Sequence, residues 1–303
     1  MPATRRSLAN LARTLDELQS RLERATVLDP VADEVAGWSD RLLPRGVTRD
    51  VASGVPIAHP LHPLLVAVPI GSWTAASWLD LTGGDRKAAR RLVGLGILGA
   101  LPAVVTGVND WLTTSGGERR VGITHALVND VALTLYGASW LARRRGRQVK
   151  GTLLALSGFA VTAVGGWLGG GITYALGVGV DTTVFQKFPT DWTDVAAEAD
   201  VRAGTVAKGD ADGVPVLLVR DGDRIVALAD RCTHRGGPLH EGELGADCIT
   251  CPWHGSRFAF DGSVLAGPAT RPQPSLEVRV VAGRVEIRRP DEPRALRTNP
   301  VGR

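Results

Sequence analysis

Cysteine is scarce in this sequence. The 303 residues contain three cysteines, Cys232, Cys248 and Cys251, and all of them lie in one short stretch near the C-terminal end. An odd number of cysteines packed so closely does not predict a disulfide framework, because such a framework needs pairs. Metal binding is the better interpretation of this group.

Charged residues are sparse between residues 60 and 180, where Leu, Val, Ala, Gly and Trp dominate, whereas residues 1–50 and 190–303 have the composition of soluble polypeptide. The net charge of +4 comes largely from arginine clusters between apolar segments. A membrane surface therefore explains the basic balance better than a nucleic acid does, and we predict no nucleic-acid partner. No apolar core follows Arg5 and Arg6, which argues against an export signal.

Leucines recur at spacings of three and four residues in the first part of the chain. They are Leu8, Leu11, Leu15, Leu18 and Leu22. This spacing predicts an amphipathic helix that rests on the protein or on a lipid surface; a short coiled coil is the alternative. Asp29-Pro30 should interrupt this helix, and we assign residues 1–55 to a helical N-terminal segment with a second short helix and a linker.

Four apolar segments follow, at about residues 61–81, 92–112, 121–142 and 151–178. Each is long enough to cross a lipid core of roughly 30 Å, so we predict an all-α bundle of four transmembrane spans over residues 56–180. A water-soluble bundle would need a polar face that these segments mostly lack. Gly94, Gly96 and Gly99 match a dinucleotide-binding fingerprint formally, but inside an apolar helix they predict close helix packing instead.

The pattern changes beyond a predicted linker at residues 181–192. Short β-prone runs, "VPVLLV", "RIVALA", "LEVRVV" and "RVEIRR", are divided by Gly, Asp and Pro. They predict a small all-β domain over residues 193–290, and thus a multi-domain chain. Residues 291–303 are expected to be a disordered tail.

The cysteine-rich stretch lies between the second and third of these runs, so its side chains should sit on two loops that the sheet presents. Cys232-x-His234 and Cys251-x-x-His254 offer two thiolates and two imidazoles. Such a set suits tetrahedral zinc or a two-iron cluster. Zinc fingers normally group cysteines with cysteines, whereas here each loop contributes one residue of each kind.

"CTHRGG" and "CPWHGSRF" resemble the two cluster loops of the Rieske [2Fe-2S] family, and "GPAT" at 267–270 resembles its proline-bearing third loop. The resemblance implies that Cys232 and Cys251 bind the inner iron of a [2Fe-2S] cluster and that His234 and His254 bind the outer iron. Neutral imidazoles leave the cluster less negative than four thiolates would, which raises its potential above that of an all-cysteine ferredoxin.

Differences from the respiratory Rieske subunit indicate which kind of Rieske protein this sequence resembles. That group carries an extra cysteine in each loop, and Gly237 and Trp253 stand at the matching positions, so no disulfide clamp is expected. The resemblance makes Ser256 a hydrogen-bond donor to the cluster, whereas Phe258 replaces a tyrosine donor. The loss of one donor predicts a lower potential, nearer that of the Rieske ferredoxins that feed oxygenases. We expect Cys248 to be a buried strand residue and His240 a polar loop residue.

His59, His62 and His125 are the histidines outside the β domain, and they stand at the starts of the first and third spans. In a four-span domain those ends face the same side, so we predict that the three cluster there with Asp110 at the end of the second span. Polar residues inside a membrane are costly and are candidates for function. Haem b bound by two histidines and a quinone or proton-handling pocket are the functional hypotheses; helix capping is the alternative.

We predict a membrane-anchored Rieske one-electron transfer protein whose partners are the lipid bilayer and redox donor and acceptor proteins or quinone. We do not expect it to be a terminal oxygenase itself, since the sequence predicts no catalytic iron domain after the cluster domain. The alternatives are a haem- or quinone-linked membrane oxidoreductase and a non-redox module with structural zinc.

The apolar region resembles an uncharacterised bacterial four-helix membrane-domain family that occurs fused to Rieske domains, which implies a bacterial plasma membrane. The positive-inside rule places the β domain outside the cell. Cofactor assembly favours the cytoplasm, because a folded iron-sulfur domain needs a dedicated export route. The side of the membrane and the oligomeric state stay open.

Overall fold

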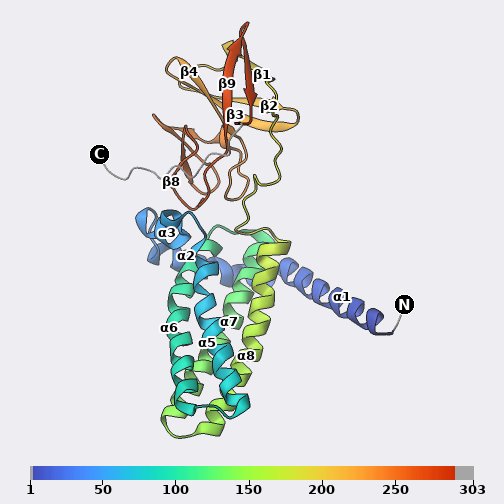
Figure 1. The fold of residues 1–303 in the computed structure, drawn as a ribbon, viewed down its shortest axis with the longest axis vertical. Coiled ribbons are helices and arrows are strands. Elements are labelled where there is room, and N and C mark those ends of the chain that lie inside the picture. The colour runs from blue at the N-terminus through green and yellow to red at the C-terminus, as the bar shows by residue number, and fades with distance from the viewer. Residues whose placement is uncertain (1–2, 291–303) are drawn as a thin grey trace. The chain divides into compact units, whose positions relative to one another are not determined.

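The computed structural model describes residues 3–290, so the tail expected at 291–303 lies outside the described residues. The chain forms two compact units, Met1–Pro44 with Leu61–Val178, and Arg45–Pro60 with Gly179–Arg303. The described part of the first unit is helical and that of the second is mainly β-sheet, which confirms the predicted change of fold class (Figure 1).

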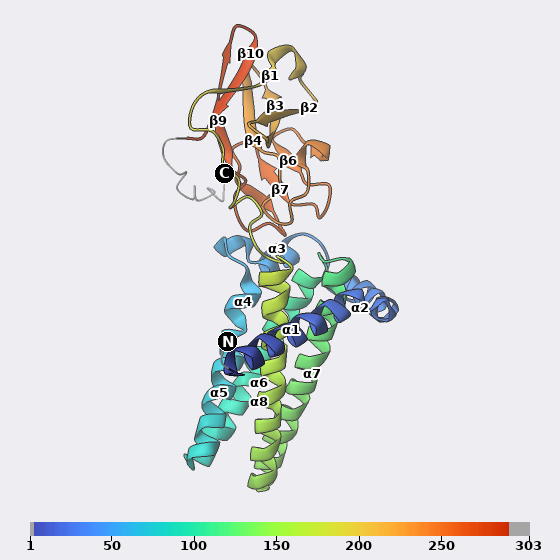
Figure 2. The same cartoon turned by 90° about the vertical axis from the view of Figure 1, so that its right-hand side faces the viewer.

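The helical unit is built around four long helices that lie side by side (Figures 1 and 2). Its helices are α1 (Ala3–Arg24), α2 (Asp29–Leu42), α4 (Leu61–Leu65), α5 (Ala67–Thr82), α6 (Arg86–Trp111), α7 (Gly116–Arg144) and α8 (Gln148–Gly170), with short turns at Thr26–Leu28 and Gly171–Ala175. Helices α5 to α8 pack in a ring, each against its neighbours in sequence, and α8 closes the ring against α5.

Close packing of an aromatic pair holds the centre of this ring. The rings of Trp73 on α5 and Tyr136 on α7 stack with centroids 4.0 Å apart and planes 11° from parallel. A β-carbon on Gly96 of α6 would lie 2.1 Å from the indole nitrogen of Trp73, so only glycine fits there. This contact supports the interpretation of that glycine as a packing residue, in place of a nucleotide-binding one.

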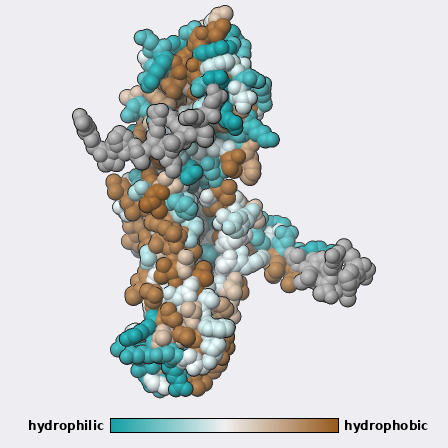
Figure 3. All heavy atoms as spheres, viewed as in Figure 1, coloured by the Kyte–Doolittle hydropathy of each residue, from teal (hydrophilic) through white to brown (hydrophobic). Residues whose placement is uncertain are grey.

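Three stretches are long and apolar enough to cross a membrane, namely Leu61–Thr82, Arg86–Trp111 and Gln148–Ala175. The predicted count of four spans is therefore not confirmed. Helix α7 is long enough at 29 residues, or about 44 Å at 1.5 Å per residue, but His125, Asn129 and Asp130 make its middle more polar. Exposed leucines and valines cover much of the visible face of the helical unit (Figure 3).

The amphipathic N-terminal helix is confirmed as α1, and the interruption at Asp29-Pro30 places Pro30 in the first turn of α2. The leucine stripe of α1 is partly uncovered, with Leu11 56% and Leu18 45% exposed.

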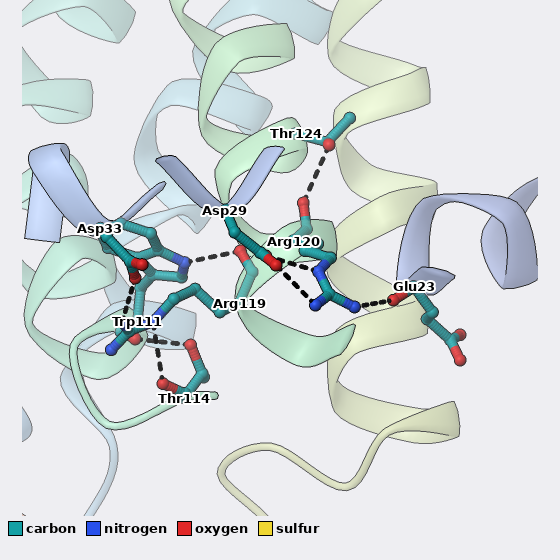
Figure 4. Close-up of polar contacts among 8 residues, drawn as sticks. All are labelled: Glu23, Asp29, Asp33, Trp111, Thr114, Arg119, Arg120 and Thr124. Atoms are coloured by element: carbon teal, nitrogen blue, oxygen red, sulfur yellow. Dashed lines mark hydrogen bonds and ion pairs between the residues drawn. The ribbon is translucent and has the colours of Figure 1, made fainter. Parts of the chain in front are cut away.

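Two arginines at the start of α7 hold the segment between α1 and α2 (Figure 4). Arg120 donates to both carboxylate oxygens of Asp29, at 2.6 and 2.8 Å, and to the backbone oxygen of Glu23 at 2.8 Å. Arg119 donates to Asp33 at 3.0 Å. A bidentate arginine fixes orientation as well as distance, so these contacts anchor the N-terminal helices to the bundle.

The β unit consists of two antiparallel sheets. The six-stranded sheet has the order β1-β10-β9-β4-β3-β2 and the four-stranded sheet the order β5-β6-β7-β8. Their strands are β1 (Thr193–Ala197), β2 (Val206–Ala211), β3 (Val214–Asp221), β4 (Arg224–Ala229), β5 (Glu243–Leu244), β6 (Cys248–Thr250), β7 (Arg257–Ala259), β8 (Val264–Ala266), β9 (Ser275–Val281) and β10 (Arg284–Arg288). All four predicted β-prone runs are strands, and side chains such as Leu217, Leu228 and Ile249 form the buried core between the sheets.

Residues 45–60 differ from the sequence-based assignment, which placed 45–55 in the N-terminal segment and 56–60 in the membrane domain, because they belong to the β unit. They form α3 (Val47–Ser53) and a short turn at Val55–Ile57. The physical reason is a hydrogen bond of 2.7 Å from the backbone N–H of Gly267 to the Asp50 carboxylate.

Candidate metal centre

Two loops of nearly identical backbone design present the two Cys/His pairs. The first loop, residues 230–238, follows β4, and the second loop, residues 251–256, joins β6 to β7. In the first, the N–H of Gly236 donates to the oxygen of Cys232 at 2.8 Å, and the N–H of Cys232 donates to the oxygen of Gly237 at 2.9 Å.

The second loop repeats this pattern. The N–H of Gly255 donates to the oxygen of Cys251 at 3.1 Å, and the N–H of Cys251 donates to the oxygen of Ser256 at 2.8 Å. Gly236 and Gly255 have φ angles of 75° and 77°, in the left-handed region that glycine adopts at no steric cost. The shared spacing of cysteine and glycine in the sequence therefore encodes a shared turn.

These turns bring the four predicted ligands together as two pairs. The thiols of Cys232 and Cys251 are within hydrogen-bonding contact, and both residues are buried, at 1% and 3% exposure. The rings of His234 and His254 lie 5.1 Å apart between centroids and nearly perpendicular, and both residues are partly exposed. The thiols thus form an inner pair and the imidazoles an outer pair.

The chemistry of the donors fits a metal. The Cys232 thiol donates to the sulfur of Cys251, which lowers the pKa of Cys251 and raises the pKa of Cys232. Burial, followed by the nearby charge of His254, lowers the pKa of His234 to about 3, so its imidazole is neutral at pH 7. Neutral imidazole and thiolate are the forms that bind metals.

The Nδ1 atom of His234 is buried without a hydrogen-bond partner among the described residues. A buried nitrogen lone pair without a partner is unfavourable unless something else binds it. No three His, Cys, Asp or Glu side chains of residues 3–290 surround a single ion position. The donors form two pairs instead, which matches two irons with two protein ligands each.

A third loop, residues 267–274 between β8 and β9, supports both of the others. Gln273 is 2% exposed, and its amide oxygen accepts the N–H of Thr233 at 3.1 Å. Its amide nitrogen donates to the oxygens of Ala229 and Arg231, both at 2.7 Å. Gln273 therefore clamps both sides of Cys232, and nothing in the local sequence pattern revealed it.

The same third loop positions Ser256. The N–H of Ala269 donates to the Ser256 hydroxyl oxygen at 3.0 Å, and Ser256 is fully buried. Because that oxygen already accepts a bond, the hydroxyl hydrogen stays available for the donor role that the resemblance implies. Phe258 on β7 is also fully buried and belongs to the same core cluster as Cys232 and Cys251.

Two further groups of contacts support the first loop, one made by the distant residue Thr182 and one made within the region by Asp230. The Thr182 hydroxyl donates to the backbone oxygen of Cys232 at 2.7 Å. Buried Asp230 accepts the backbone N–H and the Nδ1 of His240, both at 2.7 Å, so His240 is more tightly held than a polar loop residue need be. Sequence analysis missed Thr182 and Asp230, since neither belongs to a recognisable motif.

Positions 237 and 253, where the respiratory subunit carries its extra cysteines, are neighbours in space. A β-carbon on Gly237 would lie 3.0 Å from Cγ of Trp253 and 2.9 Å from the sulfur of Cys251. The indole thus occupies the room beside the glycine. Cys248 is a buried residue of β6, as expected, and its sulfur accepts a hydrogen bond from Arg257 at 3.2 Å.

The histidines of the predicted membrane site are divided between the units. His62 on α4 contacts the backbone oxygen of Ala103 through Nδ1 at 2.9 Å, and His125 on α7 contacts that of Gly165 at 2.9 Å. Both histidines belong to the helical unit. Asp110 is on α6 of the same unit. His59 differs from the prediction, because it lies in the segment that packs with the β unit.

Two family matches cover most of the chain between them. Residues 58–182 match the family described as "Predicted membrane protein (DUF2231)". Residues 191–280 match the family described as "Rieske [2Fe-2S] domain". The resemblances read from the sequence are thereby confirmed in both parts.

Individual relatives match the β unit. "Ferredoxin CarAc" of Metapseudomonas resinovorans is 37% identical over 98 residues, which are 32% of this chain and 92% of the ferredoxin. "Anthranilate 1,2-dioxygenase ferredoxin subunit" of Burkholderia cepacia is 29% identical over 32% of this chain and 91% of its own.

The "Cytochrome b6-f complex iron-sulfur subunit" of Chlorobaculum tepidum is 31% identical over 31% of this chain, and the chain spans about half (51%) of that subunit's length. With the paired loops and the ferredoxin match over nearly its full length, the chain belongs to the Rieske [2Fe-2S] family, with a DUF2231 membrane-protein domain preceding the Rieske domain.

Proposed function

We propose that this protein is a membrane-anchored Rieske electron-transfer protein that passes one electron at a time between a donor and an acceptor. The observation that carries the proposal is the pairing of inner thiols with outer imidazoles in a chain that also contains membrane-length helices. When bound, a [2Fe-2S] cluster supplies a centre that accepts and releases single electrons.

The residues of the two cluster loops have different roles. Buried Cys232 and Cys251 hold the inner side and keep water away from it. His234 and His254 are partly exposed, so they form the side from which a partner would receive or supply the electron. Trp253, 56% exposed beside His254, adds an aromatic surface for such a partner. Ser256 contributes one hydroxyl donor and Phe258 contributes none, which supports a lower potential than that of the respiratory subunits.

We infer that the partners are separate redox proteins or a quinone. Two of the relatives are named as ferredoxins, one of them the ferredoxin subunit of a dioxygenase. Another is named as the iron-sulfur subunit of a cytochrome complex. The match over nearly the full length of the two ferredoxins favours an electron carrier, whereas the match to the terminal oxygenase component of carbazole 1,9a-dioxygenase covers 27% of that component.

We infer further that α7 is a fourth membrane span. The Asn129 amide donates to the backbone oxygen of His125 at 2.8 Å, and a β-carbon on Gly165 of α8 would lie 2.7 Å from the Asn129 side-chain oxygen. Two of the polar residues that lower the hydropathy of α7, His125 and Asn129, are therefore turned toward α8, whereas Asp130 is exposed. Polar side chains that face the bundle interior are tolerated in a span. The bacterial plasma membrane is the location that we propose, and the uncovered leucines of α1 suit its surface.

A second role is favoured by His62 and His125. Each Nδ1 contacts a backbone oxygen, which selects the Nδ1–H tautomer and leaves a lone pair on Nε2; in His125 the amide nitrogen of Asn129 lies 3.3 Å from that atom. Their rings pack against Gly107 and Gly169, where a β-carbon would lie 2.8 and 3.0 Å from a ring carbon. Such oriented imidazoles suit a haem iron or a quinone oxygen, in which case the protein would be a membrane oxidoreductase with two redox centres.

The first test is a reduced-minus-oxidised optical spectrum of the detergent-purified protein with assays for iron, acid-labile sulfide, haem and zinc. A Rieske spectrum with two irons and two sulfides per chain supports the electron-transfer proposal. Haem bands that disappear in His62→Ala and His125→Ala variants would support the second role. Zinc without labile sulfide would refute both and leave a structural metal module.

A further inference from the structure

The helical unit has a basic groove at the end formed by the α5–α6 and α7–α8 turns. A cavity of about 410 Å³ is lined by Arg90 and Arg91 of α6 and by Trp140 and Arg144 of α7. The guanidinium of Arg144 lies 4.8 Å from the centre of the Trp140 ring, a cation–π contact that holds it over the groove.

The groove carries unbalanced positive charge. Among the described residues, Arg90, Arg91 and Arg144 form no ion pair, and no carboxylate lines the cavity. Asp85 attracts Arg91 electrostatically, but its carboxylate oxygen is engaged by the N–H groups of Lys87 and Ala88 at the start of α6.

Arg143, the neighbour of Arg144 in the sequence, differs from the three groove arginines. Its side chain is fully buried and forms a bidentate pair with buried Asp80. The chain therefore neutralises the arginine that it buries, whereas the three groove arginines keep their charge available to an outside anion.

Apolar surface continues from the groove toward the middle of the bundle. Leu95 and Leu98 follow Arg91 at spacings of four and seven residues, so they lie on the same face of α6, and they are 50% and 66% exposed. On α7, Leu141 precedes Arg144 by three residues and is 41% exposed. Figure 3 shows this change of character, with hydrophilic residues at the end of the helical unit and hydrophobic residues beyond them.

We propose that this groove binds the phosphate headgroup of an anionic phospholipid, with an acyl chain lying along the exposed leucines. Arginine forks match phosphate oxygens in pairs, and basic grooves between membrane helices are suited to such headgroups. The adjoining apolar track favours a lipid over free phosphate, since a free anion would gain nothing from Leu95 and Leu98.

The test compares lipid binding by the full-length protein in neutral detergent, measured by native mass spectrometry with phosphatidylglycerol, phosphatidylcholine or inorganic phosphate added. We expect tight binding of phosphatidylglycerol. The Arg90→Gln/Arg91→Gln/Arg144→Gln variant should bind it roughly a hundredfold more weakly, or about fivefold per arginine. The control variant Arg145→Gln/Arg147→Gln/Lys150→Gln loses the same charge at the same end and should bind within about twofold of the natural protein.

Three results would overturn the proposal: equal weakening in both variants, equal binding of phosphatidylcholine, or displacement of phosphatidylglycerol by equimolar inorganic phosphate. The last would mark the groove as a site for a soluble anion. If the triple variant fails to fold, as judged by helical circular dichroism, the single variants Arg90→Gln and Arg144→Gln provide the same comparison with a smaller loss.

Discussion

The first and second cluster loops share one backbone turn but differ in how the rest of the chain supports them. The second loop joins β6 and β7, which are neighbours in one sheet, so its ends are fixed locally. The first loop joins strands of different sheets and is held from a distance by Thr182 and Gln273. Equal motifs in the sequence therefore do not imply equal stability of the two loops.

The largest effect should come from the inner ligands, where the loops are equivalent. We expect Cys232→Ser and Cys251→Ser each to abolish the cluster, because each removes one of two thiolates on the same side. Iron and labile sulfide in the purified protein would measure this. Cys248→Ser is the matched control and should keep both, since Cys248 lies on a strand and contacts Arg257. Cluster retained in either ligand variant would contradict the assignment.

The substitution Gln273→Leu should destabilise the first cluster loop more than the second. It removes three buried hydrogen bonds that hold the first loop, and at about 1 kcal/mol each we expect a loss of about 3 kcal/mol in the free energy of unfolding of the Rieske domain. Heating the full-length protein while following cluster absorbance would report this as earlier cluster loss. Gln273→Glu keeps the oxygen that accepts from Thr233 but sets an oxygen, in place of the donating nitrogen, against the carbonyls of Ala229 and Arg231, so it should lose at least as much. A Gln273→Glu variant as stable as the natural protein would show that the amide nitrogen is not part of the clamp.

Ser256→Ala changes the second loop and should act on the potential more than on stability. Removing a donor disfavours the reduced, more negative form, so the potential should fall by on the order of 50 mV, the equivalent of one hydrogen bond of about 1 kcal/mol. Redox titration followed by electron paramagnetic resonance would measure it. Ser263→Ala is the control, because the Ser263 hydroxyl donates to Asp261 in the β7–β8 turn. An unchanged potential in Ser256→Ala would remove Ser256 from the site.

Phe258→Tyr is the reciprocal test at the same centre. If the missing hydroxyl accounts for a lower potential, adding it should raise the potential by a similar amount, on the order of 50 mV. The buried position of Phe258 makes stability the necessary control, measured by the same cluster-loss experiment. A stable variant with an unchanged potential would show that another feature sets the potential in this protein.

The sequence was sufficient to predict the local structure of the site. The Cys/Gly spacing predicts both turns, and the β-prone runs predict the strands that present them. The pattern could not reveal Gln273 or Thr182, because a residue distant in the sequence has no fixed spacing from the loop that it supports. In the helical unit, hydropathy averages over all faces of a helix. It therefore cannot distinguish polar residues directed at α8, such as Asn129, from residues directed at lipid.

The contact of Asp50 is another that the sequence pattern does not predict. Its substitution should have the smallest effect on stability of these variants. The carboxylate of Asp50 accepts the N–H of Gly267, and a β-carbon on that glycine would lie 3.0 Å from Val55, so α3 packs closely on the third loop. Asp50→Ala should cost about 1 kcal/mol and speed hydrogen exchange at the Gly267 amide roughly fivefold, whereas Asp50→Asn keeps an acceptor and should change little. Because the third loop contacts both cluster loops, through Gln273 and through Ala269, the variant should loosen both to a similar small extent. Faster exchange confined to the first loop would mean that Gln273, and not α3, determines the difference between the two loops.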